Sequence, residues 1–151
     1  MKLRIKFSLL VFLPVGVIIL GIGLFLFISE KRALNREIKE NQQSLLDTFV
    51  QISRDALLVH DEIPILNYIN FLKRNEMVTY AGLRDKYGKV LAHSDSGLIG
   101  KRVTAITSSS EDISELSREI FVGKEAAGTV FIGFSKKVSR LLIQDKLNEF
   151  G

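Results

Sequence analysis

The longest hydrophobic run of the chain lies at its start. Phe7 to Ile28 contains no charged residue, and Lys2, Arg4 and Lys6 precede it. As a helix it would reach roughly 33 Å, enough to cross a hydrocarbon core of about 30 Å. The run is too long for the apolar core of a secretory signal peptide and has no small-residue cleavage motif after it. The pattern therefore predicts a transmembrane helix over residues 7–28, with residues 1–6 as a basic cytoplasmic tail under the positive-inside rule.

The next segment, residues 29–60, has helical periodicity and no turn signal. Its clearest apolar stripe steps by four and three residues, as in a coiled-coil seam: Leu45, Phe49, Ile52, Ala56 and Val59. The same stripe would serve an amphipathic helix that packs on the sheet of its own domain. A homodimer seam and an intramolecular face are both open interpretations.

A break follows at residues 60–64, where Asp61 can cap a helix and Pro64 is acceptable in a first turn. A short helix is predicted over 63–74, with a buried side formed by Ile65, Leu66, Ile69 and Leu72.

From Met77 onward the pattern changes to strands. Two hairpins are predicted, the first from strands 77–83 and 89–93, the second from strands 118–122 and 128–134. The last strand is apolar on both faces, so we expect it to be central in a sheet that spans 77–134. A polar, Ser-rich loop over 94–117 separates the hairpins, and a C-terminal helix is predicted over 135–150, capped by Ser135. The fold class is therefore α+β, with helices around an antiparallel sheet.

Composition narrows the functional classes. The formal net charge is +4, yet all 17 acidic residues lie beyond the hydrophobic run, so the rest of the chain is close to neutral. No basic stripe typical of nucleic-acid binding is evident, and we expect no nucleic-acid partner. The chain has no Cys, which excludes disulfides and thiolate chemistry. The part after the hydrophobic run is long enough for one small domain.

A family resemblance rests on the order of the elements and on four short stretches. These are residues 80–85 (Tyr-Ala-Gly-Leu-Arg-Asp), 88–95 (Gly-Lys-Val-Leu-Ala-His-Ser-Asp), 99–101 (Ile-Gly-Lys) and 128–134 (Gly-Thr-Val-Phe-Ile-Gly-Phe). With them, residues 29–150 resemble the single Cache (PAS-like) extracytoplasmic sensor domains of bacterial sensor kinases and related receptors. The resemblance implies a bacterial inner-membrane protein whose sensor domain lies outside the cytoplasm, binds a small molecule in a pocket of the sheet and acts as a homodimer.

The same resemblance implies candidate ligand contacts. In the citrate and fumarate sensors of that family, a His before a loop ending in Ile-Gly contacts the carboxylate, as does an Arg that opens a later strand. By position these are His93 and Arg118, and a guanidinium can hold a carboxylate bidentately. Such sensors carry another Arg three residues before the His, where this chain has Val90. The cations able to compensate are Arg84, Lys101 and Arg102.

Each of these residues also has a purely structural interpretation. His93 can be a strand-end residue bonded to its own loop, with Asp95 as the turn cap. Tyr80 is a candidate to stack on a ligand, and a place in the core is the alternative. Lys101 and Arg102 can be solvated loop charges.

Catalytic constellations are not evident in the sequence. His93, Ser94 and Asp95 are neighbours on one strand and cannot converge as a triad, and no phosphate-binding glycine loop or HExxH motif is present. With His60 and His93 as the histidines, we expect no metal and no cofactor. We expect a non-enzymatic, membrane-anchored sensing module in which ligand binding displaces the terminal helices, any kinase or cyclase output lying in sequence outside this chain. The alternative is a bitopic structural or interaction protein that oligomerises through its long helix and binds no metabolite.

Overall fold

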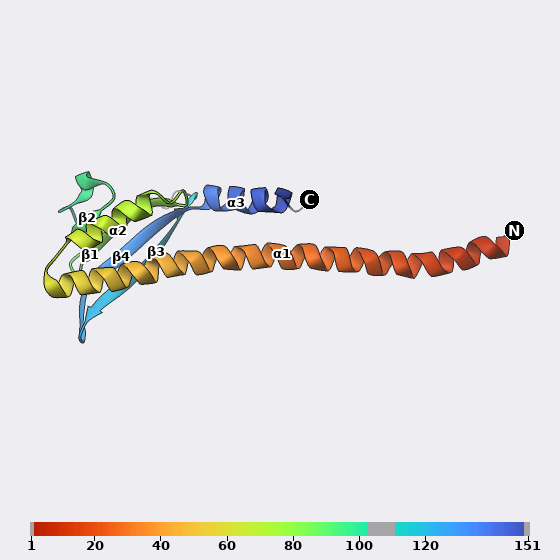
Figure 1. Cartoon of the computed structure of the whole chain (residues 1–151), viewed down its shortest axis with the longest axis horizontal. Helices are drawn as coiled ribbons and strands as arrows, with labels where there is room; N and C mark the ends of the chain where they lie inside the picture. Colours follow the sequence, from red (N-terminus) through yellow and green to blue (C-terminus); the bar gives the residue numbers. More distant parts are fainter. Residues whose placement is uncertain (1, 103–110, 150–151) are drawn as a thin grey trace. The chain divides into compact units, whose positions relative to one another are not determined.

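A computed structural model describes residues 2–102 and 111–149 (Figure 1). The chain divides into two compact units, Met1–Ile38 and Lys39–Gly151, and each is described by itself. The described elements are three α-helices, a short 3₁₀ helix and a four-stranded antiparallel sheet, so the α+β fold class is confirmed.

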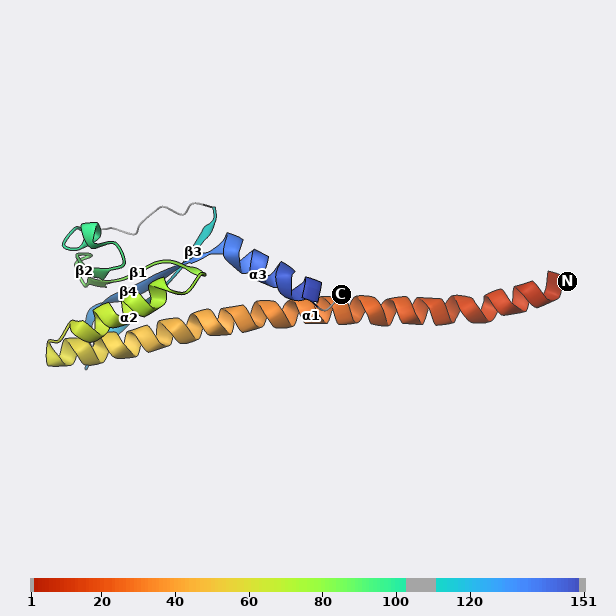
Figure 2. The ribbon, with the colours of Figure 1, turned by 45° about the horizontal axis from the view of Figure 1, so that its top comes forward.

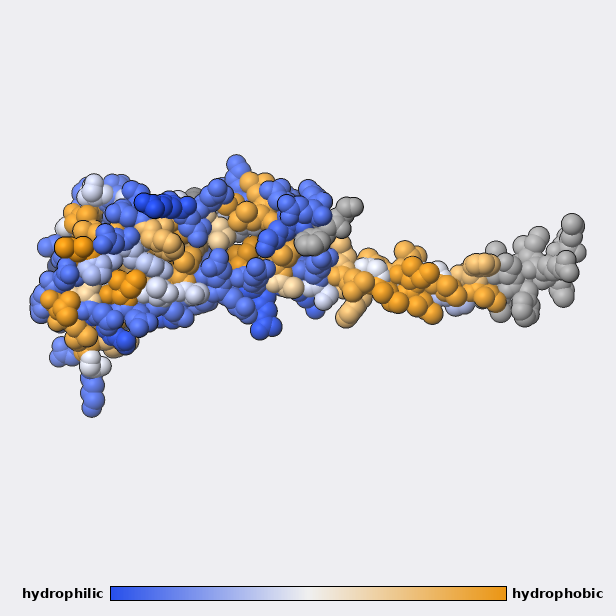
Figure 3. Space-filling view, in the orientation of Figure 1, coloured by the Kyte–Doolittle hydropathy of each residue, from blue (hydrophilic) through white to orange (hydrophobic). Residues whose placement is uncertain are grey.

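Helix α1, Lys2–Val59, carries both the predicted membrane-spanning segment and the predicted long helix. It begins at Lys2, so the basic residues of the predicted tail are themselves helical. In the first unit, the large apolar side chains from Val11 to Ile28 are 47–72% exposed, and this surface is mostly hydrophobic (Figure 3). By length and composition, this part of the helix can cross a membrane.

The junction between α1 and α2, Ile63–Lys73, lies where the sequence predicts a break. His60 has φ 56°, and the Asp61 N–H donates to the Ala56 carbonyl at 3.0 Å, which is the hydrogen-bond pattern of a Schellman helix end. The Asp61 carboxylate then accepts from the Ile63 N–H at 3.0 Å, and Pro64 lies in the first turn of α2. The N-cap position of α2 is Glu62 and not the predicted Asp61, and Glu62 makes no side-chain cap, so the Asp61 bond supports the helix start from one residue further out.

The sheet has the strand order β2-β1-β4-β3, all pairs antiparallel (Figure 2). Its strands are β1 Val78–Asp85, β2 Val90–His93, β3 Ile113–Val122 and β4 Glu125–Ser135. Strand β4 pairs with both β1 and β3, so the prediction of a central last strand is confirmed. Strand β3 begins at Ile113 and not at Arg118, so the predicted start was wrong. Its first half was missed because Ser114, Glu115 and Ser117 leave it without the apolar run that marks β4.

Most buried apolar side chains of the sheet lie on one face, with Phe131 buried on the other. The first face contributes Ala81, Leu83, Ile120, Val130, Ile132 and Phe134, α1 contributes Leu46, Phe49, Ser53 and Ala56, and α2 contributes Ile65, Ile69 and Leu72. The two helices contact each other where the Tyr68 hydroxyl of α2 donates to the Leu45 carbonyl at 2.9 Å. The structure therefore supports the intramolecular interpretation of the α1 stripe.

Two details of the predicted helix faces were wrong. On α1 the buried line passes through Leu46 and Ser53 beside Phe49 and Ala56, while Val59 is 70% exposed. On α2, Leu66 was expected inside but is 42% exposed. The docking angle of each helix, which the sequence does not specify, decides which edge of a broad apolar stripe is buried.

Between the hairpins, the 3₁₀ helix η1, Ser96–Leu98, begins after Asp95, whose carboxylate accepts from the Gly97 N–H at 2.9 Å. Part of the predicted polar loop, residues 103–110, lies outside the described residues. Helix α3, Lys136–Glu149, agrees with the predicted 135–150, and the Ser135 hydroxyl caps it by accepting from the Val138 N–H at 3.3 Å.

Candidate functional site

The face of the sheet opposite the core carries a cluster of rings. Strand alternation places Tyr80, Gly82 and Arg84 of β1 on this face, because Ala81 and Leu83 between them point into the core. Gly82 pairs with His93 of β2 on one side and with Phe131 of β4 on the other. We call this side of the sheet the open face.

Two glycines on the open face make room for the rings. A Cβ on Gly82 would lie 2.6 Å from Phe131 Cζ and 2.9 Å from His93 Cδ2. A Cβ on Gly133 would lie 2.5 Å from two ring atoms of Tyr80. The rings of Tyr80, His93 and Phe131 can therefore lie over the strands because these two positions have no side chain.

The three rings form one contiguous group. Tyr80 and His93 are stacked, with ring centroids 6.0 Å apart and planes 17° apart, and the His93 ring centroid lies 5.7 Å from that of Phe131. The Arg84 guanidinium carbon is 5.5 Å from the Phe131 ring centroid, a cation–π contact. Arg84 thus lies one ring away from His93.

His93 is the most unusual member of this group. It is 7% exposed, and its Nδ1 accepts a hydrogen bond from the Asp95 N–H at 2.9 Å. In the neutral ring the proton is therefore on Nε2, and this buried atom has no hydrogen-bond partner among the described residues. Burial lowers the pKa of His93 below its ordinary value, against the smaller opposing effects of Asp95 and Glu115. A buried donor without a partner is costly, so a ligand acceptor placed there would be stabilised.

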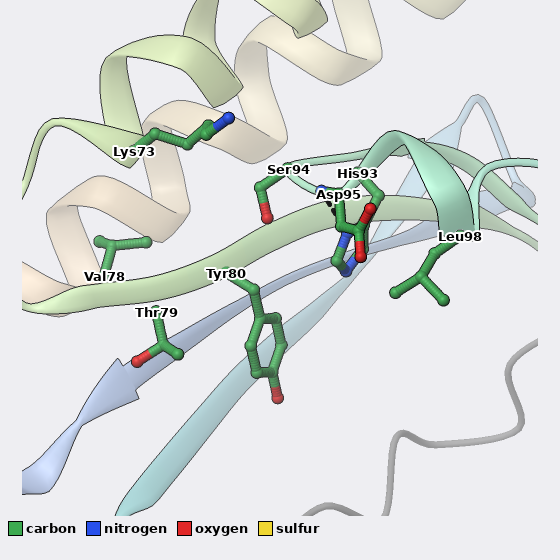
Figure 4. Close-up of a pocket in the computed structure, with 8 residues that line it drawn as sticks. All are labelled: Lys73, Val78, Thr79, Tyr80, His93, Ser94, Asp95 and Leu98. Atoms are coloured by element: carbon green, nitrogen blue, oxygen red, sulfur yellow. Dashed lines mark hydrogen bonds between the residues drawn. The ribbon is translucent and has the colours of Figure 1, made fainter.

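A pocket of about 450 Å³ opens beside His93 (Figure 4). It is bounded by α2, β1, the end of β2 and η1 through Lys73, Val78, Thr79, Tyr80, His93, Ser94, Asp95 and Leu98. In Figure 4 the rings of Tyr80 and His93 lie next to each other, and Lys73 lies beside α2, with β1 between it and the Tyr80 ring in this view. The size is within the range of small-molecule sites.

Tyr80 connects this pocket to the far edge of the sheet. Its hydroxyl donates to the Glu115 carboxylate of β3 at 2.6 Å. Burial, with the neighbouring Glu115 carboxylate, raises the pKa of the Tyr80 hydroxyl well above its ordinary value. Tyr80 is therefore held as a neutral phenol that donates across β4.

The structure brings some of the sequence-predicted residues together and separates others. Tyr80 and His93 line the pocket, and Arg84 adjoins their ring group.

Arg118 pairs with Val130 and so lies on the core side of the sheet, where it forms an ion pair with Asp47 and donates to Gln43 Oε1 at 3.1 Å. Arg102 is exposed, and its backbone forms an isolated antiparallel β-bridge with Lys89, next to β2. The sheet thus separates Arg118 from His93, the pair expected to share a ligand.

Lys73 and Glu115 are among the site residues that were missed from the sequence. Lys73 reaches the pocket because α2 packs beside β1 and β2, and Glu115 reaches Tyr80 because β3 and β1 flank β4. Neither residue belongs to a motif. In the part of the chain that the structure describes, no group of three or more His, Asp or Glu side chains is placed to hold a metal ion.

No protein-family model matches the chain, and no curated protein matches it.

Proposed function

We propose that the chain is a membrane-anchored ligand-sensing module, built like a single Cache domain, without catalytic activity of its own. The observation that carries the proposal is the pocket lined by His93, whose buried Nε2–H has no hydrogen-bond partner among the described residues. The apolar segment of α1 supplies the anchor. In this proposal the sensor domain lies outside the inner membrane of a bacterium, because the basic residues before the span favour a cytoplasmic start.

The pocket chemistry favours a small ligand with one acceptor group, such as a monocarboxylate. A ligand that displaces the side chains covering the buried His93 Nε2–H would receive one hydrogen bond from it, and the Lys73 ammonium, which also lines the pocket, can balance a single negative charge. Asp95 lines the same pocket, and Glu115 lies behind Tyr80. These two carboxylates disfavour a di- or tricarboxylate, particularly since Arg118 lies on the other face of the sheet.

This proposal is tested by a thermal-unfolding screen of the full chain in lipid nanodiscs, with unfolding monitored by circular dichroism. The screened library contains monocarboxylates, amino acids and dicarboxylates. A ligand is expected to raise the Tm of the wild type, and the rise should be lost in Lys73→Gln and in His93→Asn. Arg102→Gln is the matched control, because it removes a cation outside the pocket and should preserve the response. No hit in the library, or a response that survives both pocket variants, would overturn the proposal.

A second candidate function is that of an interaction protein. It is favoured by an exposed apolar patch where α1 meets α2, formed by Leu58, Val59 and Ile63. Sedimentation of the full chain in detergent would separate the candidates. A stable homo-oligomer that Val59→Asp dissociates, together with no ligand in the screen, would favour this function over sensing.

A further inference from the structure

Strand β3 holds two side-chain links on opposite faces, three residues apart. Glu115 pairs with Gly133 and belongs to the open face, whereas Arg118 pairs with Val130 and belongs to the core side. Glu115 accepts from Tyr80 in the pocket wall, and Arg118 bonds to α1. The same short stretch of one strand therefore contacts both the pocket wall and the long helix.

The link on the open face crosses a whole strand. Tyr80 of β1 and Glu115 of β3 are both register partners of Gly133, which lies between them on β4. The Tyr80 ring passes over Gly133 at a distance that a Cβ would forbid, and its hydroxyl donates to Glu115 at 2.6 Å. A displacement of the Tyr80 ring therefore alters a bond to β3 directly.

The link on the core side is made by the two arms of one guanidinium. Arg118 forms an ion pair with Asp47 and donates to Gln43 at 3.1 Å. Gln43 and Asp47 are four residues apart and so lie on the same side of α1. Strand β3 lies at an edge of the described sheet and has β4 as its one neighbouring strand there, so its other edge is not held by backbone pairing.

We propose that β3 couples the pocket to α1, with Glu115 and Arg118 as positioning residues on its two faces. A ligand that displaces the Tyr80 hydroxyl releases Glu115, β3 shifts at the sheet edge, and Arg118 transmits the shift to Gln43 and Asp47. This assignment rests on the proposed sensing function for its biological purpose. It gives Arg118 a role in transmission and none in contacting the ligand.

The test is hydrogen exchange on the full chain in nanodiscs without any ligand, read by mass spectrometry. Tyr80→Phe removes the hydroxyl and keeps the ring, so we expect several-fold faster exchange in peptides covering residues 43–50 of α1 and little change in α2. Glu115→Gln should give the same local pattern. Tyr87→Phe is the matched control, because Tyr87 is an exposed tyrosine in the β1–β2 turn and should change nothing.

Combining variants separates transmission from general loosening. In an Arg118→Gln background the link to α1 is already broken, so Tyr80→Phe should add no further exchange in residues 43–50. The charge exchange of Arg118→Asp with Asp47→Arg should restore the response to Tyr80→Phe. Additive effects, a uniform increase over all helices, or no change in α1 would overturn the coupling. The two tests are independent. A negative hydrogen-exchange result would contradict the coupling through β3 and not the ligand-sensing function, whereas a negative ligand screen would contradict the sensing function and not the coupling.

Discussion

At the level of single residues, His93 shows how a strand end becomes a candidate binding group. From the sequence, His93 could be interpreted either as a ligand contact or as a structural residue bonded to its own loop. The structure shows the loop bond on Nδ1, to the Asp95 N–H, and leaves Nε2 facing no partner among the described residues. One ring nitrogen thus has the structural role, and the same bond fixes the tautomer that makes the other a donor.

The lowered pKa of His93 predicts an acid-sensitive fold. The unfolded chain takes up a proton near pH 6.5, whereas the native state resists protonation until a lower pH. Stability contributed by neutral His93 is therefore present above about pH 6.5 and lost as the pH falls through the native pKa. Each tenfold difference in proton affinity between the unfolded and native states corresponds to about 1.4 kcal/mol of this stability.

Urea midpoints between pH 7.5 and 5 would check this prediction. His93→Asn should remove part of the decline, since its side-chain oxygen can still accept from the Asp95 N–H but does not titrate. His60→Asn serves as the control at an exposed position with φ 56°, which Asn tolerates, and it should leave the decline intact. Equal pH slopes in the wild type and His93→Asn would contradict the assignment.

At the level of elements, helix α1 packs with its own domain through a stripe that includes a polar residue. Ser53 is fully buried in this stripe, and its hydroxyl has no hydrogen-bond partner among the described residues. An unsatisfied buried hydroxyl reduces stability, so this position is not optimised for packing.

Ser53→Ala is therefore expected to raise the free energy of unfolding by about 1 kcal/mol or more. Part of the gain comes from the higher helix propensity of Ala, about 0.5 kcal/mol. Ser44→Ala is the matched control, because Ser44 is exposed on the same helix and reports propensity alone. A gain at Ser53 no larger than that at Ser44 would show that the buried hydroxyl finds a partner in solution.

The strands show where reasoning from sequence succeeded and where it failed. Strand β4 was placed correctly because it is apolar on both faces, and this pattern needs a central position. Strand β3 was found only in its second half, because an edge strand with one exposed face tolerates Glu115, Ser117 and Glu119. Strand β3 pairs with β4 in a register fixed by their hairpin, and this register places Arg118 on the core side of the sheet. The separation of Arg118 from His93 therefore follows from strand pairing and could not be seen in the sequence of β3 alone.

At the level of the whole molecule, the apolar segment of α1 is the feature that favours a membrane location. Its side chains are exposed within their own unit, and such a mostly apolar surface would be unfavourable in water. A spanning helix satisfies its own backbone groups, so a membrane would remove this cost.

Val17→Asp combined with Ile18→Asp should abolish stable insertion, because each charge near the centre of a span costs about 2.5–3.5 kcal/mol. After alkaline carbonate extraction, the wild type is expected in the membrane pellet and the double variant in the supernatant. Thr48→Asp with Gln51→Asp adds the same charge at exposed positions of the same helix and should remain in the pellet. A double variant at 17 and 18 that still resists extraction would argue against a span.

Local patterns in the sequence were sufficient to predict the apolar segment, the order of helices and strands, the helix break at His60 and the central position of the last strand. These features depend on periodicity and capping, which act between residues a few positions apart. The folded chain was needed to show which edge of α1 is buried, which side of the sheet carries Arg118, and how Lys73 and Glu115 come to adjoin the Tyr80–His93 pair. These outcomes depend on helix docking and strand register, which join segments far apart in the chain and leave no periodic signal in any one of them.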